Sequence, residues 1–225
     1  MPSLIETHKL AFFGIPKIAS TSMKLVLFEL QYGKPISDYT PPPGQKLKPL
    51  HDHYPSRKLQ RNDFERCENY WKFAVVRDPV DRILSAYGHR VVGLGDLEKR
   101  SSAKRKARFL RISLRPDLEE FCLRLNRYRF MSRLIRHHVR PQSDFLGHDL
   151  SKLDASYPIE SMAKLADDLA ERTGRPIEIP KNSGVGPRFT RSDMSPKATR
   201  AIVRNFAADY NLLRGVYLPP SNSKH

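Results

Sequence analysis

Cysteine is scarce in this chain: Cys67 and Cys122 are the only two among 225 residues, and no C-x-x-C pair occurs. A disulfide framework needs more cysteines, and a structural zinc site needs four ligands at short spacings. The sequence therefore argues against both kinds of scaffold. We expect two reduced, half-buried thiols.

Long apolar runs are also missing. No segment approaches the roughly 18 apolar residues of a membrane-spanning helix. The first nine residues mix acidic and basic side chains, unlike a signal peptide. Taken as a natural full-length sequence, the chain is expected to be cytoplasmic. With 39% hydrophobic and 28% charged residues, we expect a single globular domain over residues 1–225.

Acidic residues are few: 24 Asp and Glu stand against 40 Lys and Arg, a net charge of +16. The excess is concentrated in residues 99–140, where 14 basic side chains meet only three acidic ones. Such a surface attracts polyanions, and charge alone does not select one. The stretch suits an acceptor cleft for an acidic polysaccharide, peripheral contact with an anionic membrane or glycolipid, or a solvated face.

Two short apolar segments, residues 10–15 and 71–76, are rich in β-forming side chains and predict buried strands. Each precedes a helical pattern, over residues 22–32 and from Pro79 or Val80 to about Val91. Two strand–helix pairs predict an α/β fold with a central parallel sheet flanked by helices.

Further elements follow along the chain. Residues 33–57 are rich in proline and polar side chains, and predict mostly loop. Helical spacing runs through residues 117–139, with Leu118, Phe121, Cys122, Leu125 and Phe130 as its apolar positions. Residues 160–172 predict an amphipathic helix closed by Gly174, and residues 176–180 a short strand. Ser195 and Pro196 predict the start of a final helix that reaches about Tyr210.

The turn between the first strand and its helix reads Gly14-Ile15-Pro16-Lys17-Ile18-Ala19-Ser20-Thr21-Ser22. A turn here directs backbone amides and the positive end of the helix dipole at one point, which favours an anion. The ATP-binding pattern G-x-x-x-x-G-K-[ST] does not fit, because Ala19 and Ser20 replace its second glycine and lysine. An ordinary turn whose hydroxyls cap the helix is the plain structural alternative.

A second polar set follows the second strand. Arg77 leaves the predicted sheet at its ligand-binding edge, and Ser85 lies about two helical turns later. Arginine offers a fork of donors suited to a phosphate, and serine a neutral donor. Taken singly, Arg77 also fits a surface ion pair, and Ser85 also fits a residue that packs in a helix.

Together the two motifs resemble those of sulfotransferases that use 3′-phosphoadenosine-5′-phosphosulfate (PAPS), above all the carbohydrate branch with heparan, chondroitin and bacterial enzymes. Residues 16–22 are similar to the family's 5′-phosphosulfate loop. Val76-Arg77-Asp78-Pro79-x-x-Arg82-x-x-Ser85-x-Tyr87 is similar to its 3′-phosphate motif. Residues 140–146, 179–183 and 208–213 resemble later segments of that branch, whereas the basic middle matches none of them.

The resemblance implies a P-loop-like nucleotide site and sulfuryl transfer from PAPS to a hydroxyl of a carbohydrate or glycolipid. Lys17 would stabilise the leaving oxygen, and Ile18, Ala19, Ser20, Thr21 and Ser22 would hold the 5′-phosphosulfate. Arg77 and Ser85 would hold the 3′-phosphate. No metal is required by this scheme.

The general base is expected in His51-Asp52-His53, because the family often places a catalytic histidine in an H-x-H context. A histidine with its ordinary pKa of about 6.5 is largely neutral at pH 7 and suits that role. Similarity of placement favours His53 over His51. Solvated surface histidines and a metal fragment are the alternatives, although no third and fourth ligands stand out.

Two other functions remain open from the residues. A basic nucleic-acid-binding protein would explain the charge, but few aromatic residues interleave the basic run, and both motifs would be unexplained. An ATP-dependent kinase would explain the phosphate loop, but the loop departs from the ATP pattern. We therefore expect no nucleic-acid partner.

Overall fold

The computed structural model describes residues 2–99, 102–181 and 184–220. The chain forms two compact units, which we call the sheet unit and the helical unit. The sheet unit consists of Met1–Val76 and Gln142–Asn182, and the helical unit of Arg77–Pro141 and Ser183–His225. The chain therefore crosses from one unit to the other three times.

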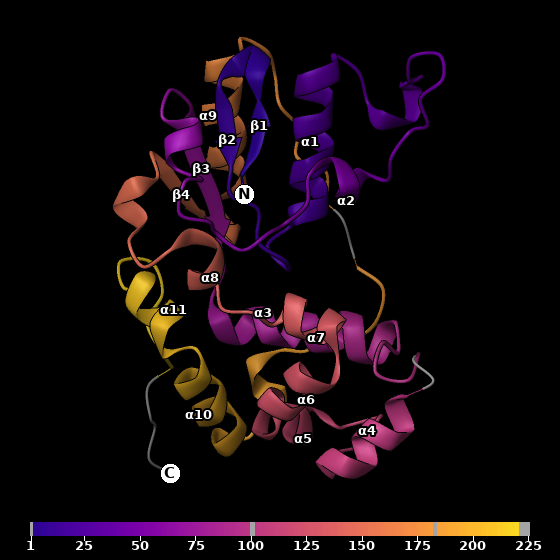
Figure 1. Ribbon diagram of the computed structural model, residues 1–225. Coiled ribbons are helices and arrows are strands. Elements are labelled where there is room, and N and C mark those ends of the chain that lie inside the picture. Colours follow the sequence, from indigo (N-terminus) through magenta and orange to yellow (C-terminus); the bar gives the residue numbers. More distant parts are fainter. Residues whose placement is uncertain (1, 100–101, 182–183, 221–225) are drawn as a thin grey trace. The chain divides into compact units, whose positions relative to one another are not determined.

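The sheet unit contains a four-stranded sheet with the order β1-β2-β3-β4 (Figure 1). Its strands are β1 (Ser3–Ile5), β2 (Leu10–Phe12), β3 (Trp71–Val76) and β4 (Ala155–Pro158). β3 runs parallel to both β2 and β4, and β1 is antiparallel to β2. The predicted α/β fold with a parallel sheet is confirmed, and β3 matches its predicted range. β2 is shorter, although the amide of Phe13 still donates to the Phe73 carbonyl at 2.9 Å.

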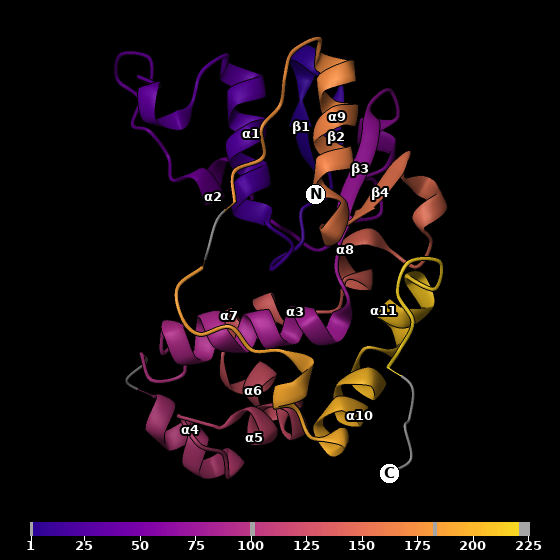
Figure 2. The ribbon, with the colours of Figure 1, turned by 180° about the vertical axis from the view of Figure 1, so that it is seen from behind.

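Among the described residues of the sheet unit there are four α-helices: α1 (Ser20–Tyr32), α2 (Leu50–His53), α8 (Ser143–Leu146) and α9 (Met162–Thr173). α1 packs against β1, and α9 packs against β4. Figure 2 shows α9 in front of the sheet, covering one of its faces. α1 and α9 end at Gly33 and Gly174, whose left-handed backbone has φ of +74° and +69°. Both ends agree with the prediction.

The predicted strand at residues 176–180 is wrong, since these residues form no regular element. Pro176 and Pro180 lack the amide hydrogens that a strand needs. The sheet instead gains β1 and β4, which are too short for a clear periodic signal. Six short 3₁₀ segments complete the described chain: Glu6–His8, Ile36–Asp38, Glu65–Cys67, Leu150–Lys152, Ile159–Ser161 and Arg191–Asp193.

The helical unit is built from α3 (Pro79–Ala86), a π-helix (Tyr87–Gly93), α4 (Ala103–Leu110), α5 (Leu118–Leu123), α6 (Leu125–Met131), α7 (Arg133–His138), α10 (Pro196–Asn205) and α11 (Ala207–Leu212). These helices have their own apolar core, separate from the sheet. Its most buried members include Val80, Ile83, Phe121, Tyr128, Ile202 and Phe206, all fully buried. Burial of such side chains is the main stabilising contribution to the unit.

The helical pattern predicted over residues 117–139 is divided into α5, α6 and α7. It breaks at Arg124 and at Ser132, whose hydroxyl accepts a hydrogen bond from the amide of Ile135 at 3.3 Å. Phe130, which the spacing placed among the apolar positions, is 71% exposed. The final helix starts as predicted, with Ser195 accepting from the amide of Ala198 at 3.0 Å, but breaks at Phe206.

The helix after β3 was predicted to reach about Val91, and it does so by changing from α to π at Tyr87. Gly88 and Gly93 lie five residues apart, the hydrogen-bonding interval of a π-helix. A Cβ atom on Gly88 would lie 2.2 Å from the Pro187 carbonyl oxygen, and one on Gly93 2.7 Å from that of Val185. The two glycines therefore let the loop of residues 184–189 lie directly on this helix.

Cys67 and Cys122 are free thiols, as expected, but the expected half-burial is wrong, because both side chains pack inside the apolar cores and are fully buried. Within the described ranges, every helix is too short or too polar to cross a membrane.

Candidate functional site

The loop that follows β2 has an unusual backbone. Lys17 and Ala19 adopt left-handed conformations, with φ of +70° and +59°, although neither is a glycine. Such residues are strained, and strain of this kind gathers at binding and catalytic sites. The fully buried side chain of Ile18 anchors the loop between them. The turn is therefore a constrained structure and not an arbitrary connection.

The structural alternative for this loop, a helix capped by its own hydroxyls, does not describe α1. The residue at the cap position is Ala19, which has no side-chain acceptor for the first amides of the helix. Ser20 and Thr21 lie within the first turn, half-buried, and Ser22 is 2% exposed. The amides and the positive end of the helix dipole thus lack a side-chain cap at Ala19, as an anion-binding turn requires.

Arg77 directly follows the last residue of β3 and is half-buried. Its neighbour Asp78 begins α3 as an N-cap and accepts hydrogen bonds from the amides of Val80 at 2.8 Å and Asp81 at 3.3 Å. The Asp78 carboxylate also accepts from the Tyr210 hydroxyl at 3.2 Å. The Asp78 carboxylate lies 3.0 Å from the guanidinium of Arg191, and burial raises the pKa of Asp78. Asp78 therefore stabilises the fold by joining the start of α3 to Tyr210 and Arg191.

Arg82, the second arginine of the motif, is fully buried. Its guanidinium donates to the carbonyls of His138 and Arg140 and lies 4.0 Å from the Asp209 carboxylate. Burial lowers the pKa of Arg82 to about 10. Arg82 therefore ties α3 to α11 and to the end of α7. Sequence reasoning missed this partnership, although Asp209 and Tyr210 stood in a segment that resembled the family.

Asp78 and Arg82 contact partners within the fold, whereas Arg77 and Ser85 are the two residues of this motif that the sequence predicts as phosphate ligands. Ser85 lies half-buried in the last turn of α3, just before the π-helix. Both residues belong to the helical unit, whereas the loop from Lys17 to Ser22 belongs to the sheet unit. Each motif therefore lies within a single unit.

The two candidate bases lie on α2, which packs against α1. The Tyr54 hydroxyl fixes this contact by donating to Gln31 Oε1 at 2.6 Å. His51 is exposed, and its Nδ1 lies 3.0 Å from Nζ of Lys24. The His53 ring instead packs edge-on against Phe28, with 5.3 Å between centroids. Among the described residues, its buried Nε2 has no hydrogen-bond partner.

Lys24 is the functional candidate that sequence reasoning missed. It is 3% exposed and lies in the second turn of α1, the helix that follows the strained loop, and burial lowers its pKa to about 8. A perturbed lysine beside a histidine and close to an anion loop is typical of functional sites. The sequence contains an indication of this burial, because Lys24 shares its helix face with Leu27 and Phe28, both buried.

Replacing Lys24 by methionine is expected to stabilise the protein. The folded-state pKa of about 8 lies below the ordinary 10.5, so burying the ammonium costs about 3 kcal/mol at pH 7. This loss of stability is complete below pH 8. It decreases between pH 8 and 10.5, because in this range the unfolded chain binds more protons than the folded chain and the free energy of unfolding rises with pH. Urea unfolding of both proteins at pH 7 and pH 10 measures the difference. Lys46→Met, at an exposed position, is the control, and equal stabilisation by both would contradict the assignment.

Within the described residues, no group of three or more His, Cys, Asp or Glu side chains is arranged to hold a metal ion.

A sequence model of the sulfotransferase family matches residues 4–217. Carbohydrate sulfotransferase 10 from Pongo abelii is 30% identical over 93 residues, which are 39% of this chain and 25% of that protein. Carbohydrate sulfotransferase 11 from Danio rerio is 31% identical over 91 residues, 38% of this chain and 24% of that protein. The matched segments thus span about a quarter of these relatives. No solved structure gives a significant match. Since the family match includes both motifs and runs through both units, the chain belongs to the sulfotransferase family.

Proposed function

We propose that this protein transfers a sulfuryl group from PAPS to a hydroxyl of a carbohydrate or glycolipid acceptor. The strained loop around Lys17 and Ala19, which opens into α1 directly after β2, is the observation that carries the proposal. Family membership supports it. The names of the two relatives support a carbohydrate acceptor. We propose further that residues 1–225 act as one sulfotransferase domain.

The reaction is an in-line displacement at sulfur. The acceptor oxygen forms a bond to sulfur while the bond to the bridging oxygen of the nucleotide breaks, and that oxygen keeps the electron pair as 3′,5′-ADP leaves. The ammonium of Lys17 stabilises the charge on the leaving oxygen. The amides of Ile18 and Ala19, with the amides and hydroxyls of residues 20–22, hold the 5′-phosphosulfate. This scheme needs no metal ion.

Arg77 and Ser85 hold the 3′-phosphate, which distinguishes this donor from AMP and ATP. The guanidinium donates a paired set of charged hydrogen bonds, and the hydroxyl adds a neutral one. Asp78 and Arg82 fix α3 in the fold, so they position Ser85 without being needed as ligands.

A histidine of α2 takes the proton of the acceptor hydroxyl. Similarity of placement favours His53, but His51 has the exposed ring, and its Nδ1 is oriented by Lys24. When Lys24 is charged, it donates to Nδ1 and the imidazole carries its proton on Nε2, where it cannot act as a base. When Lys24 is neutral, the Nδ1–H of His51 donates to Nζ, and the free lone pair on Nε2 takes the acceptor proton. We therefore propose His51 as the base and keep His53 as the alternative.

Calorimetric titration with 3′,5′-ADP tests the donor site, with 5′-AMP and ATP plus magnesium for comparison. We expect micromolar binding of 3′,5′-ADP alone, and binding about 10- to 100-fold weaker in Arg77→Ala, because a charged hydrogen-bonded contact to phosphate is removed. Arg61→Ala, at an exposed position in the sheet unit, should bind like the wild type. Equal, weak binding of all three nucleotides would favour a nucleic-acid-binding protein, and magnesium-dependent ATP binding a kinase.

A further inference from the structure

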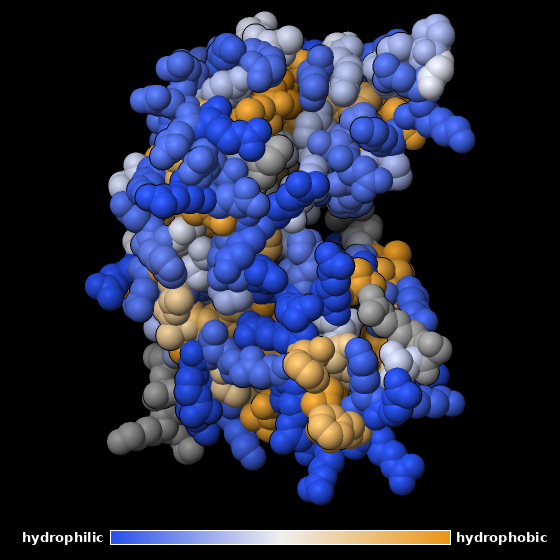
Figure 3. Space-filling model, viewed as in Figure 1, coloured by the Kyte–Doolittle hydropathy of each residue, from blue (hydrophilic) through white to orange (hydrophobic). Residues whose placement is uncertain are grey.

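The helical unit exposes large aromatic side chains in its most basic region. Phe109 on α4 is 82% exposed and Phe130 on α6 is 71% exposed. Leu123 and Leu134, at 37% and 40% exposure, lie in the same stretch of chain. Figure 3 shows hydrophobic residues gathered over α4–α6 with hydrophilic ones around them. Exposed apolar groups gathered in this way mark an interaction surface more often than isolated ones do.

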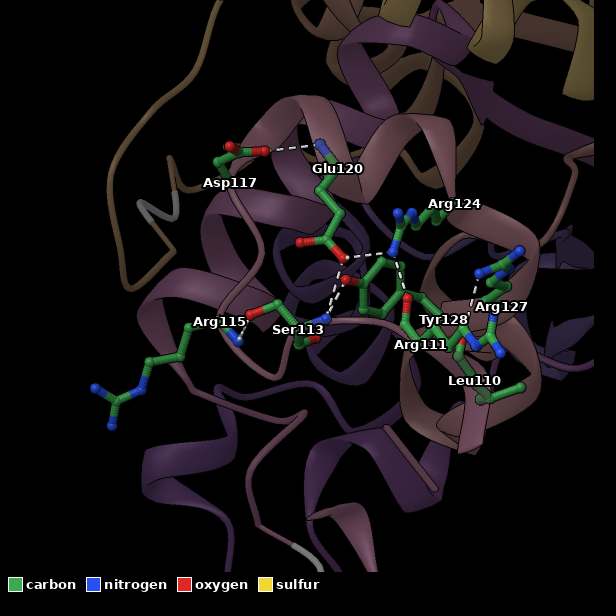
Figure 4. A network of polar contacts seen from close by, with 9 residues as sticks. All are labelled: Leu110, Arg111, Ser113, Arg115, Asp117, Glu120, Arg124, Arg127 and Tyr128. Atoms are coloured by element: carbon green, nitrogen blue, oxygen red, sulfur yellow. Dashed lines mark hydrogen bonds and ion pairs between the residues drawn. The ribbon is translucent and has the colours of Figure 1, made fainter. Parts of the chain in front are cut away.

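The two phenylalanines are displayed on helices that are fixed to one another. Arg127 on α6 donates to the Leu110 carbonyl at 2.9 Å, and Arg124 donates to the Arg111 carbonyl. Tyr128 adds a hydrogen bond to the Ser113 carbonyl at 3.1 Å. Figure 4 shows these contacts converging on the end of α4 from α5 and α6. Phe109 lies next to Leu110 in the chain, and Phe130 lies one helical turn after Arg127. The Arg127–Leu110 contact therefore lies close to both phenylalanines in the chain.

Unneutralised positive charge surrounds these aromatics. α4 carries four cations and no acidic residue, and none of the four forms an ion pair within the described part of the chain; they are Lys104, Arg105, Lys106 and Arg108. Arg133 and Arg136 on α7 are also exposed. Residues 99–140 hold 14 basic side chains against three acidic ones. The face thus combines long cationic side chains with protruding apolar rings.

We propose that this aromatic–basic face, formed by Phe109, Phe130 and the surrounding cations of α4, α6 and α7, docks on an anionic lipid bilayer. Cations attract the phosphate and carboxylate headgroups, and the rings insert at the boundary between headgroups and acyl chains. A sulfated polysaccharide offers charge without an apolar layer, so it leaves the exposure of both rings unexplained. A single-stranded nucleic acid offers bases for stacking, and the test includes it.

The test is co-sedimentation of the full chain with vesicles of phosphatidylcholine, with and without 30% phosphatidylserine. We expect binding only to the anionic vesicles, weakened by salt, and about tenfold weaker binding in Phe109→Ser/Phe130→Ser. Leu47→Ser/Leu218→Ser removes two exposed leucines elsewhere, at 41% and 73% exposure, and should bind like the wild type. Both mutated phenylalanines are exposed, so thermal melting should be unchanged.

Heparin and polyuridylate, tested in parallel, separate the mechanisms. We expect heparin binding to be the same in the wild type and the double phenylalanine variant, since charge alone governs it. Failure of the wild type to bind anionic vesicles would overturn the proposal, as would vesicle binding that the double variant retains in full. Polyuridylate binding that falls in the double variant, without vesicle binding, would assign the face to single-stranded nucleic acid.

Discussion

Replacing His51 by asparagine is expected to lower the rate of sulfuryl transfer about 100- to 10,000-fold, the range typical of a lost general base. Asparagine keeps a polar side chain at this exposed position, so the fold should be preserved. The measurement is transfer of ³⁵S from labelled PAPS to unsulfated heparan- and chondroitin-type chains. Binding of 3′,5′-ADP should be unchanged, because the proposed donor contacts lie in other residues.

His53→Phe is the matched control for this prediction. The His53 ring packs edge-on against Phe28 and lies 6.0 Å from the Tyr32 ring, so a phenyl ring fits its apolar surroundings. We expect this variant to keep most of its activity. Loss of activity in His53→Phe, with retention in His51→Asn, would instead assign the base to His53, as similarity of placement suggests. Full activity in both variants would exclude either histidine.

Replacing Arg82 by methionine is expected to destabilise the protein by about 3–5 kcal/mol, the effect typical of removing one partner from a buried ion pair. The carbonyls of His138 and Arg140 lose the arginine as their hydrogen-bond donor. The Asp209 carboxylate loses the positive charge that lies 4.0 Å from it in the wild type. Thermal unfolding should show a melting temperature lower by about 10 °C or more.

Arg200→Met tests whether this effect belongs to the buried arginine alone. Arg200 is exposed on α10, and exposed substitutions generally change stability by less than about 0.5 kcal/mol. Adding Asp209→Leu to Arg82→Met should restore part of the loss, because the buried carboxylate is then removed as well. If Arg82→Met has the same melting temperature as the wild type, the Arg82–Asp209 pair contributes no net stability, and its role is limited to specifying the fold.

Long, strongly patterned elements could be predicted from the sequence. β3 is a continuous apolar run, and α1 and α9 each combine helical spacing with a closing glycine, so local chemistry determines them. β1 and β4 could not, because they are three and four residues long and exist only through pairing with their neighbours. The break of residues 117–139 into three helices depends on caps such as Ser132, which a periodic apolar pattern conceals.

The places of the two proposed phosphate motifs could be predicted from the sequence, since chain order alone puts their residues after strands. The roles within the second motif could not be separated, because Asp78 and Arg82 find their partners at Tyr210 and Asp209, more than 120 residues later. The Lys24–His51 contact was missed for a similar reason. It depends on α2 lying against α1, and nothing in the loop before α2 predicts that packing.

The π-helix at Tyr87–Gly93 also has an evolutionary consequence. Deleting one residue between Gly88 and Gly93 would let this segment wind as an α-helix, with the two glycines four residues apart and still about one turn from each other. The loop that carries Val185 and Pro187 would then keep both of its contact positions. The extra residue of the π-helix should therefore be present or absent among relatives without a change in this loop, as long as both glycines are kept.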